Sequence, residues 1–308
     1  MPLETRNLNL ETSGVHWRKV TLIGVGLLGG SLGLALKRQK LARRIEGYVR
    51  RTASVAESRR KGAVDHATQD IRAAVKDADL VVLCTPLARM RPLAKHLLPA
   101  LKRGAIVTDV GSVKAGVVKE LESMVAKAGA HFVGSHPMAG GEKMGVAAAR
   151  ADLFNCAVCV VTPTRISNKA AVRKVELLWK SVGGRTITLS PETHDILVSR
   201  TSHLPHLVAA TLAGSVLGPG QPKQQPNLCA NGFRDTTRIA SGSPEMWRDI
   251  ALANRRNLSK ALKSFIGDLE RVQRLVAKGD SKGIEKFLAT AKKRRDNWCA
   301  CCASPSQE

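Results

Sequence analysis

The sequence predicts an α/β domain built on a parallel sheet, followed by an all-α domain, and three observations support this prediction. Short apolar runs that suit buried strands alternate with helical stretches as far as about residue 190. The first run leads directly into a glycine-rich turn. Beyond residue 190 the strand pattern stops and long helical segments follow. Such alternation favours a parallel sheet with helices on both faces.

The expected elements follow in this order along the chain. We expect strands at residues 19–23, 45–49, 80–84, 105–110, 132–134, 156–161 and 186–189. We expect helices at residues 27–37, 117–127 and 168–182, and the last of them ends at a Gly-Gly pair that suits a helix stop. Two long helices are expected at 191–217 and 244–295, separated by a loop rich in glycine, proline and glutamine at 218–227.

The composition argues against several classes of protein. A formal net charge of +24 is compatible with nucleic-acid binding, but the basic residues are spread along the chain. Aromatic residues make up only 3%, too few to form stacking platforms for bases. No apolar run is long enough to cross a bilayer, and the first residues lack the apolar stretch of a signal peptide. We expect a cytoplasmic protein with no nucleic-acid, membrane or metal partner.

A G-x-G-x-x-G pattern lies between the first expected strand and the first expected helix, which is the context in which it binds a dinucleotide. Gly24 would permit the tight turn, Gly26 the approach of a pyrophosphate, and Gly29 the packing of helix on strand. Leu27 and Leu28 would place backbone N–H groups of the helix start near the pyrophosphate. The alternative is a purely structural turn.

The residues after the second expected strand bear on the choice of cofactor. An acidic residue about 20 positions after the glycines would bind the ribose 2′-hydroxyl of NAD. Here Val49 stands in its place, followed by Arg50, Arg51 and Thr52. Two guanidinium groups can pair with the 2′-phosphate of NADP. We therefore predict NADP in preference to NAD, with two ordinary surface arginines as the alternative.

Other strand ends should contribute to the same crevice, because the carboxyl ends of parallel strands meet at one edge of the sheet. Thr85 and Pro86 follow the third expected strand, and Asp109 lies in the fourth. We predict that these three residues line the cofactor site. Ser112 follows the fourth strand and His136 the fifth, so both are expected near the same edge.

Five segments resemble the prephenate/arogenate dehydrogenase family, in the order in which that family has them. They are VTLIGVGLLGGS from Val20, TDVGSVK from Thr108, GSHPMAGGEKMG from Gly134, TSHLPHLVA from Thr201 and GFRDTTRIASGSPEMWRD from Gly232. The match runs from about residue 18 to about residue 290.

This resemblance implies an α/β Rossmann-like parallel-sheet nucleotide-binding domain at 18–190, followed by an all-α helical substrate and dimerisation domain at 191–295. Residues 1–17 would be an N-terminal extension and residues 296–308 a tail. An apolar side of the first long helix would pack against a second subunit in a homodimer. That side comprises Leu204, Leu207, Val208, Thr211 and Leu212.

The resemblance also implies roles for individual residues. His136 would take the proton from the ring hydroxyl of the substrate, and Ser112 would hydrogen-bond both that hydroxyl and the histidine. Arg238 would bind the ring carboxylate. Without the resemblance, each residue has a simpler explanation. His136 could be a histidine at a strand end whose hydrogen bonds are satisfied within the fold. Ser112 could cap a helix that starts near Val113, and Arg238 could pair with Asp235.

Three further residues would belong to the substrate pocket. His206 and Trp247 match residues of that pocket, and Glu142 matches a polar residue near its mouth. Two neighbours depart from the common family pattern, since Gly141 replaces a hydroxyl residue and Asn231 replaces glycine in some members. Both positions leave the choice between prephenate and arogenate open.

The chemistry of such an enzyme explains these residue types. Oxidation of the cyclohexadienol moves a hydride to NAD(P), and loss of carbon dioxide then gives 4-hydroxyphenylpyruvate from prephenate or tyrosine from arogenate. A histidine with a pKa near 6.5 suits the removal of the hydroxyl proton at neutral pH. An arginine can hold a carboxylate through two parallel hydrogen bonds.

Two other functions compete with this one. A dehydrogenase of the β-hydroxyacid type shares the two-domain layout, but it usually places a lysine or aspartate base on the helical domain. The segments HPMAG and TRIA argue against it. A basic nucleic-acid-binding protein is the second alternative, and the low aromatic content disfavours it.

Overall fold

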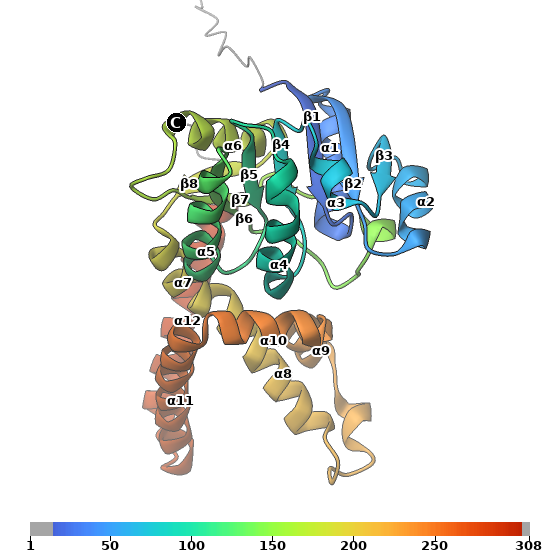
Figure 1. Ribbon diagram of the computed structural model, residues 1–308. Helices are drawn as coiled ribbons and strands as arrows, with labels where there is room; N and C mark the ends of the chain where they lie inside the picture. Colours follow the sequence, from blue (N-terminus) through green and yellow to red (C-terminus); the bar gives the residue numbers. More distant parts are fainter. Residues whose placement is uncertain (1–14, 304–308) are drawn as a thin grey trace, which may run out of the picture. The chain divides into compact units, whose positions relative to one another are not determined.

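The computed structural model describes residues 15–303 of the chain (Figure 1). The described residues form two compact units, which divide after Arg255. In the described residues, the first unit holds the sheet and the helices up to α10 (Pro244–Ala253), and the second holds most of α11 (Arg255–Ala277) and all of α12 (Ser281–Ala303).

The sheet has eight strands in the order β3-β2-β1-β4-β5-β6-β7-β8. Their bounds are β1 Trp17–Ile23, β2 Ala42–Tyr48, β3 His66–Thr68, β4 Leu80–Leu83, β5 Ile106–Asp109, β6 His131–Pro137, β7 Val158–Thr162 and β8 Arg185–Thr188. Neighbouring strands are parallel except at one place, where β7 pairs antiparallel with β6. The predicted α/β class with a mainly parallel sheet is confirmed.

Helices flank the sheet on both faces (Figure 1). The remaining helices of the first unit are α1 Leu27–Arg38, α2 Thr52–Arg60, α3 Ile71–Val75, α4 Leu87–Leu97, α5 Ala115–Lys127, α6 Lys169–Ser181, α7 Pro191–Val198, α8 Leu204–Leu217 and α9 Asn231–Thr237. The strands alternate in the face they present, because successive side chains of a strand point to opposite sides. Val82 packs in the core that contains α1 and α6, whereas Val81 and Leu83 pack in the core that contains α4 and α5.

Apart from shifts of up to three residues at strand ends, the strand predictions were wrong in three respects. The three-residue strand β3 was missed, since so short a segment shows no period. The seventh strand begins at Val158 and not at residue 156, because Cys156 has a positive φ of 59° that no strand residue adopts. The antiparallel pairing of β7 with β6 was not anticipated either, since alternation of strands and helices carries no signal for a reversal.

The long-helix predictions also need correction. Residues 191–217 are helical throughout, but a π-helical turn, η3 (Ser199–His203), separates α7 from α8. Residues 244–295 are divided among α10, α11 and α12. The first break lies at Asn254, the residue that follows the end of α10. Its side chain is buried and donates a hydrogen bond to the Asp195 carbonyl. The second lies at Gly279, whose φ of 63° ends a helix as glycine commonly does.

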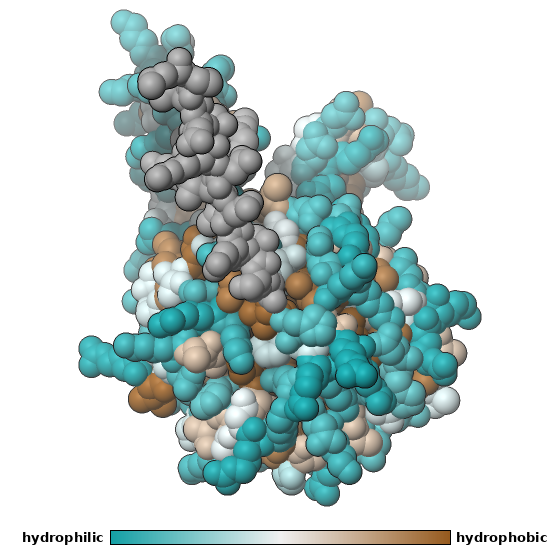
Figure 2. Space-filling view, turned by 90° about the horizontal axis from the view of Figure 1, so that it is seen from above, coloured by the Kyte–Doolittle hydropathy of each residue, from teal (hydrophilic) through white to brown (hydrophobic). Residues whose placement is uncertain are grey.

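The surface is mainly hydrophilic where Figure 2 shows it, with scattered hydrophobic patches. In the described residues no helix is both long enough and apolar enough to span a membrane.

Candidate active site

The glycine-rich turn joins β1 to α1 at the carboxyl edge of the sheet. Gly24 has a φ of 98°, and a Cβ there would lie 3.0 Å from the carbonyl oxygen of Cys84, so the turn requires glycine. A Cβ on Gly29 would lie 2.1 Å from the carbonyl oxygen of Gly24, so only glycine allows α1 to pack this closely. A Cβ on Gly26 would meet nothing within 4 Å, which leaves open space beside the turn.

These features fit a dinucleotide. The Gly26 backbone opens α1 without a side-chain cap, and the first turn, with Leu27 and Leu28, has no acidic residue. Its N–H groups therefore remain suited to an anion. At the end of the neighbouring β4, the Thr85 hydroxyl is buried without a hydrogen-bond partner among the described residues, and Pro86 then precedes α4.

Arg50, Arg51 and Thr52 follow β2 on the same edge, and all three are exposed. Arg51 precedes the first residue of α2, and Thr52 hydrogen-bonds the Gln69 side chain at 3.1 Å. Neither arginine takes part in an ion pair within the part of the chain that is described. Both guanidinium groups thus remain available to a ligand beside the end of β2.

Asp109 ends β5 fully buried, and its carboxylate is already surrounded by donors. It forms an ion pair with the equally buried Lys114, and it accepts backbone N–H bonds from Gly111 at 2.9 Å and Ser135 at 3.1 Å. Lys114 also donates to the Ser135 carbonyl at 3.0 Å. The pair therefore joins the ends of β5 and β6 immediately before His136. Contact between Asp109 and a cofactor stays a prediction.

His136 lies near the end of β6 with only 7% of its surface exposed. Its Nδ1 lies 2.9 Å from Nε2 of His194, a residue of α7 that is completely buried. His194 in turn places Nδ1 2.8 Å from Oδ1 of Asp195. These three side chains form a hydrogen-bonded chain from the sheet to α7.

Asp195 is held by the start of α5. Its Oδ1 accepts the backbone N–H of Lys114 at 2.7 Å, and its Oδ2 accepts that of Ala115 at 2.9 Å. The carboxylate thus caps α5, which begins at Ala115. The alternative reading of Ser112 as the cap of a helix starting near Val113 is therefore wrong.

Burial sets the protonation of the site histidines. It lowers the pKa of His136 well below 6.5, and the nearby basic groups of His194, Lys114 and His203 act in the same direction. Burial likewise lowers the pKa of His203 to about 4 and lowers that of His206. His136 is consequently a neutral imidazole at neutral pH, the form that can accept a proton.

Ser112 is partly buried in the segment between β5 and α5. No hydrogen bond joins its side chain to His136 within the described residues, where the Nδ1 of His136 is engaged by His194 instead. The interaction of Ser112 with His136 and the substrate hydroxyl stays a prediction.

Arg238 begins the short helix η5 (Arg238–Ser241), and its side chain is 63% exposed. It forms an ion pair with Glu142, not with Asp235. Since Glu142 belongs to the loop after β6, this pair brings the predicted carboxylate anchor beside the segment that follows His136.

His206 and Trp247, which are both predicted to line the substrate pocket, contact each other. Their rings stack at 3.5 Å between centroids with an angle of 10°. A Cβ on Gly242 would lie 2.7 Å from Nε1 of Trp247, so the backbone packs tightly against the stacked pair. Nδ1 of His206 is buried without a partner in the described chain, which leaves a polar atom for a ligand to satisfy.

Sequence reasoning missed His194 and Asp195. Neither lies in the five segments that carry the family resemblance, and a His-Asp pair in an expected helix has an ordinary surface reading. Asn254 was also missed. Its side-chain amide donates to the Asp195 carbonyl at 2.8 Å and lies 3.2 Å from Nδ1 of His203. Only contacts over 50 or more positions reveal these three residues.

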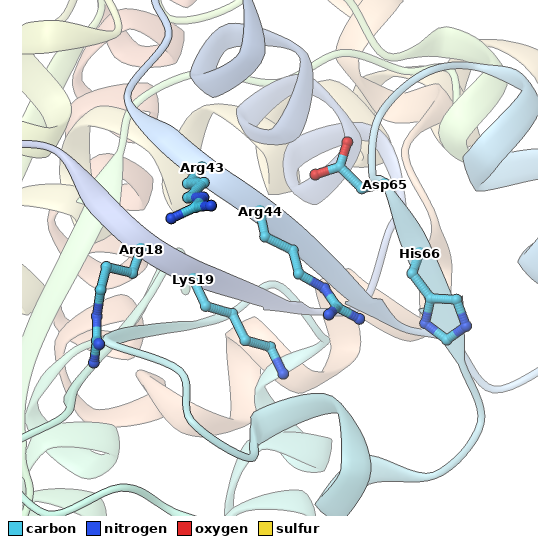
Figure 3. Close-up of a pocket in the computed structure, with 6 residues that line it drawn as sticks. All are labelled: Arg18, Lys19, Arg43, Arg44, Asp65 and His66. Atoms are coloured by element: carbon cyan, nitrogen blue, oxygen red, sulfur yellow. The ribbon is translucent and has the colours of Figure 1, made fainter.

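A basic pocket lies at the opposite, amino edge of the sheet (Figure 3). It is lined by Arg18, Lys19, Arg43, Arg44, Asp65 and His66. Several of these groups are already partnered, since Arg44 and His66 pair with Glu46 and Arg18 pairs with Asp79. This pocket lies where β1, β2 and β3 begin, whereas His136 lies near the end of β6, so we assign the pocket no part in the chemistry.

In the described residues, no group of three or more His, Cys, Asp or Glu side chains is arranged to hold a metal ion.

Comparison with sequence families gives two matches that together span most of the chain. The family described as "Prephenate dehydrogenase, nucleotide-binding domain" matches residues 32–188. The family described as "Prephenate dehydrogenase, dimerization domain" matches residues 190–290.

Individual proteins show the same similarity. The prephenate dehydrogenase of Bacillus subtilis is 35% identical over 90% of this chain and 75% of its own length. The cyclohexadienyl dehydrogenase of Zymomonas mobilis is 34% identical over 91% of this chain and 95% of its own length. The crystal structure of prephenate dehydrogenase from A. aeolicus with hydroxyphenyl propionate and NAD+ superimposes with a TM-score of 0.85, at 34% identity, and covers 91% of this chain and 98% of that one.

Proposed function

This chain belongs to the prephenate dehydrogenase family, and we propose that it oxidises and decarboxylates prephenate, arogenate or both, with NAD(P) as the hydride acceptor. The observation that carries the proposal is the buried, neutral His136 at the same sheet edge as the open glycine turn. A base and a dinucleotide site at one edge are what the oxidation of an alcohol requires.

The cofactor would be held by the glycine turn and by the N–H groups at the start of α1. When bound, the cofactor would supply the nicotinamide ring needed to accept the hydride from the carbinol carbon of the substrate. Thr85 and Pro86 would line the crevice at the end of β4, and the open space beside Gly26 supports the approach of the pyrophosphate.

The substrate would be held on the other side of the crevice. His136 takes the proton of the ring hydroxyl on its free nitrogen and becomes an imidazolium ion. Ser112 hydrogen-bonds that hydroxyl, and Arg238 binds the ring carboxylate in place of Glu142. His206 and Trp247 shape the pocket around the ring. Fixing the carboxylate fixes the distance between the hydroxyl and His136.

A spectrophotometric assay tests this function. The purified protein is incubated with prephenate, arogenate or a β-hydroxyacid, each with NAD or NADP, and the absorbance of the reduced nicotinamide is followed. We expect reduction with at least one of the first two substrates and none with the β-hydroxyacid. Activity with the β-hydroxyacid alone would refute the proposal.

We expect NADP to give a higher kcat/KM than NAD. Arg50 and Arg51 are exposed and outside any ion pair of the described chain, and they directly follow Val49, which stands where a carboxylate would select NAD. Replacing both with serine should lower kcat/KM for NADP and leave that for NAD nearly unchanged. A wild-type preference for NAD, or a preference unaffected by the double substitution, would contradict this assignment.

We also expect a homodimer. On the predicted contact side of α8, Leu204, Leu207 and Leu212 are only half-buried, and Leu217 at its end is 51% exposed. An apolar helix face of this kind can form a subunit interface. Multi-angle light scattering at micromolar concentration should give twice the chain mass of 33.1 kDa. A mass of one chain at that concentration would rule the dimer out.

A further inference from the structure

The hydrogen-bonded chain behind His136 starts at a carboxylate whose position is well defined. Asp195 receives two backbone N–H groups at the start of α5, and its own carbonyl receives the Asn254 side chain. An anion is favoured there because the amino end of a helix carries partial positive charge. Asp195 is therefore an acceptor, set in place by the fold and independent of any substrate.

This acceptor decides which nitrogen of His194 carries a proton. An ionised carboxylate has no proton to donate, so the 2.8 Å contact requires a proton on Nδ1 of His194. In a neutral imidazole the other nitrogen is then an acceptor. Nε2 of His194 consequently offers a lone pair to the atom 2.9 Å away, which is Nδ1 of His136.

The same reasoning continues to His136. Its Nδ1 must donate to His194, so a neutral His136 carries its proton on Nδ1 and the lone pair on Nε2. No hydrogen bond joins that Nε2 to another residue of the described chain. We propose that His194 and Asp195 are positioning residues that hold His136 in this one tautomer and so make Nε2 the atom that takes the substrate proton.

This inference rests on the proposed function, since it assumes that His136 is the base. After proton transfer, both nitrogens of His136 carry protons, and Nδ1 continues to donate to His194. The hydrogen-bonded Asp195 keeps that acceptor in place and stabilises the new positive charge. A side chain at position 194 that cannot accept a hydrogen bond would leave both tautomers of His136 open, and only one of them is a base at Nε2.

Two substitutions separate this role from plain packing. His194→Phe fills the space but accepts no hydrogen bond, and we expect kcat to fall by at least roughly tenfold with KM little changed, as for residues that hold a catalytic histidine in one tautomer. His194→Gln places an amide oxygen near the former Nε2, so it should recover much of kcat. His131→Phe is the matched control, because His131 begins β6, the strand that carries His136 near its other end.

A measurement on the free protein tests the tautomer without any turnover. Two-bond 1H–15N correlation spectra of histidine-labelled protein distinguish a proton on Nδ1 from one on Nε2, and the His136→Asn spectrum identifies the His136 signals. We expect the Nδ1–H form in the wild type, in His194→Gln and in His131→Phe. In His194→Phe we expect a mixture of forms or the Nε2–H form.

The outcomes are distinct. A wild-type His136 protonated on Nε2 overturns the inference, and so does a slow His194→Phe enzyme whose His136 tautomer is unchanged. If His194→Phe fails to fold by circular dichroism, the wild-type and His194→Gln spectra still decide. Failure of the proposed function would show separately, as a wild-type protein inactive with prephenate and arogenate whatever the tautomer.

Discussion

Replacing His136 with asparagine is expected to lower kcat by roughly 10²- to 10⁴-fold with little change in KM, the loss typical of a general base. Asparagine keeps a similar size and can still form hydrogen bonds, but it cannot take up a proton at neutral pH. The substrate would bind as before, and its hydroxyl would lack an acceptor for its proton. Steady-state kinetics with saturating cofactor measure both parameters.

The pH profile adds a second expectation for this residue. Because burial and the surrounding basic groups hold the pKa of His136 below 6.5, the imidazole stays neutral through the physiological range. Its protonated form cannot act as a base, so wild-type kcat/KM should fall only at a pH well below 6.5. The His136→Asn enzyme should lose this acidic limb. Turnover near the wild-type rate would refute the assignment of the base, even though the family assignment would stand.

Replacing Arg238 with glutamine is expected to raise KM strongly, by about 2 to 5 kcal/mol in binding free energy if substrate binding excludes water from the ion pair. In the free chain the guanidinium is largely exposed and paired with Glu142, and such surface pairs contribute little to stability. The substitution should therefore leave the free energy of unfolding nearly unchanged. Loss of the anchor should appear mainly in KM, with a smaller effect on kcat.

Arg150→Gln is the matched control for this experiment. Arg150 is also an exposed arginine paired with a surface carboxylate, that of Asp152, and it lies outside the proposed substrate site. It should show wild-type KM, whereas Arg238→Gln should not. An Arg238→Gln enzyme with unchanged KM would mean that the carboxylate is held elsewhere, and His206 would be the next residue to replace.

The local sequence was sufficient to place most of the strands and the glycine turn. Strand β4 is buried on both faces, so it appears as an uninterrupted apolar run. Gly24 and Gly29 are required by backbone geometry within the same turn. Features that depend on a single residue's conformation were less accessible. Cys156 delays the start of β7, and Gly279 divides a helical region, although neither changes the apolar pattern around it.

His136 and Arg238 were singled out because the segments that contain them resemble the family, but the sequence says nothing of their immediate partners. Arg238 pairs with Glu142 across 96 positions, where the local pattern had offered Asp235. His194 contacts His136 across 58 positions, and Asp195 caps α5 across about 80. Contacts of that range arise only when α7 packs beside α5 and the end of β6.

The sequence by itself therefore determined the α/β order of most elements and the glycine turn, because both depend on short-range geometry, and its resemblance to the family singled out the candidate base. Only the tertiary structure decided which nitrogen of His136 can act. That choice depends on burial and on the acceptor 2.9 Å away, and both come from segments brought together by folding.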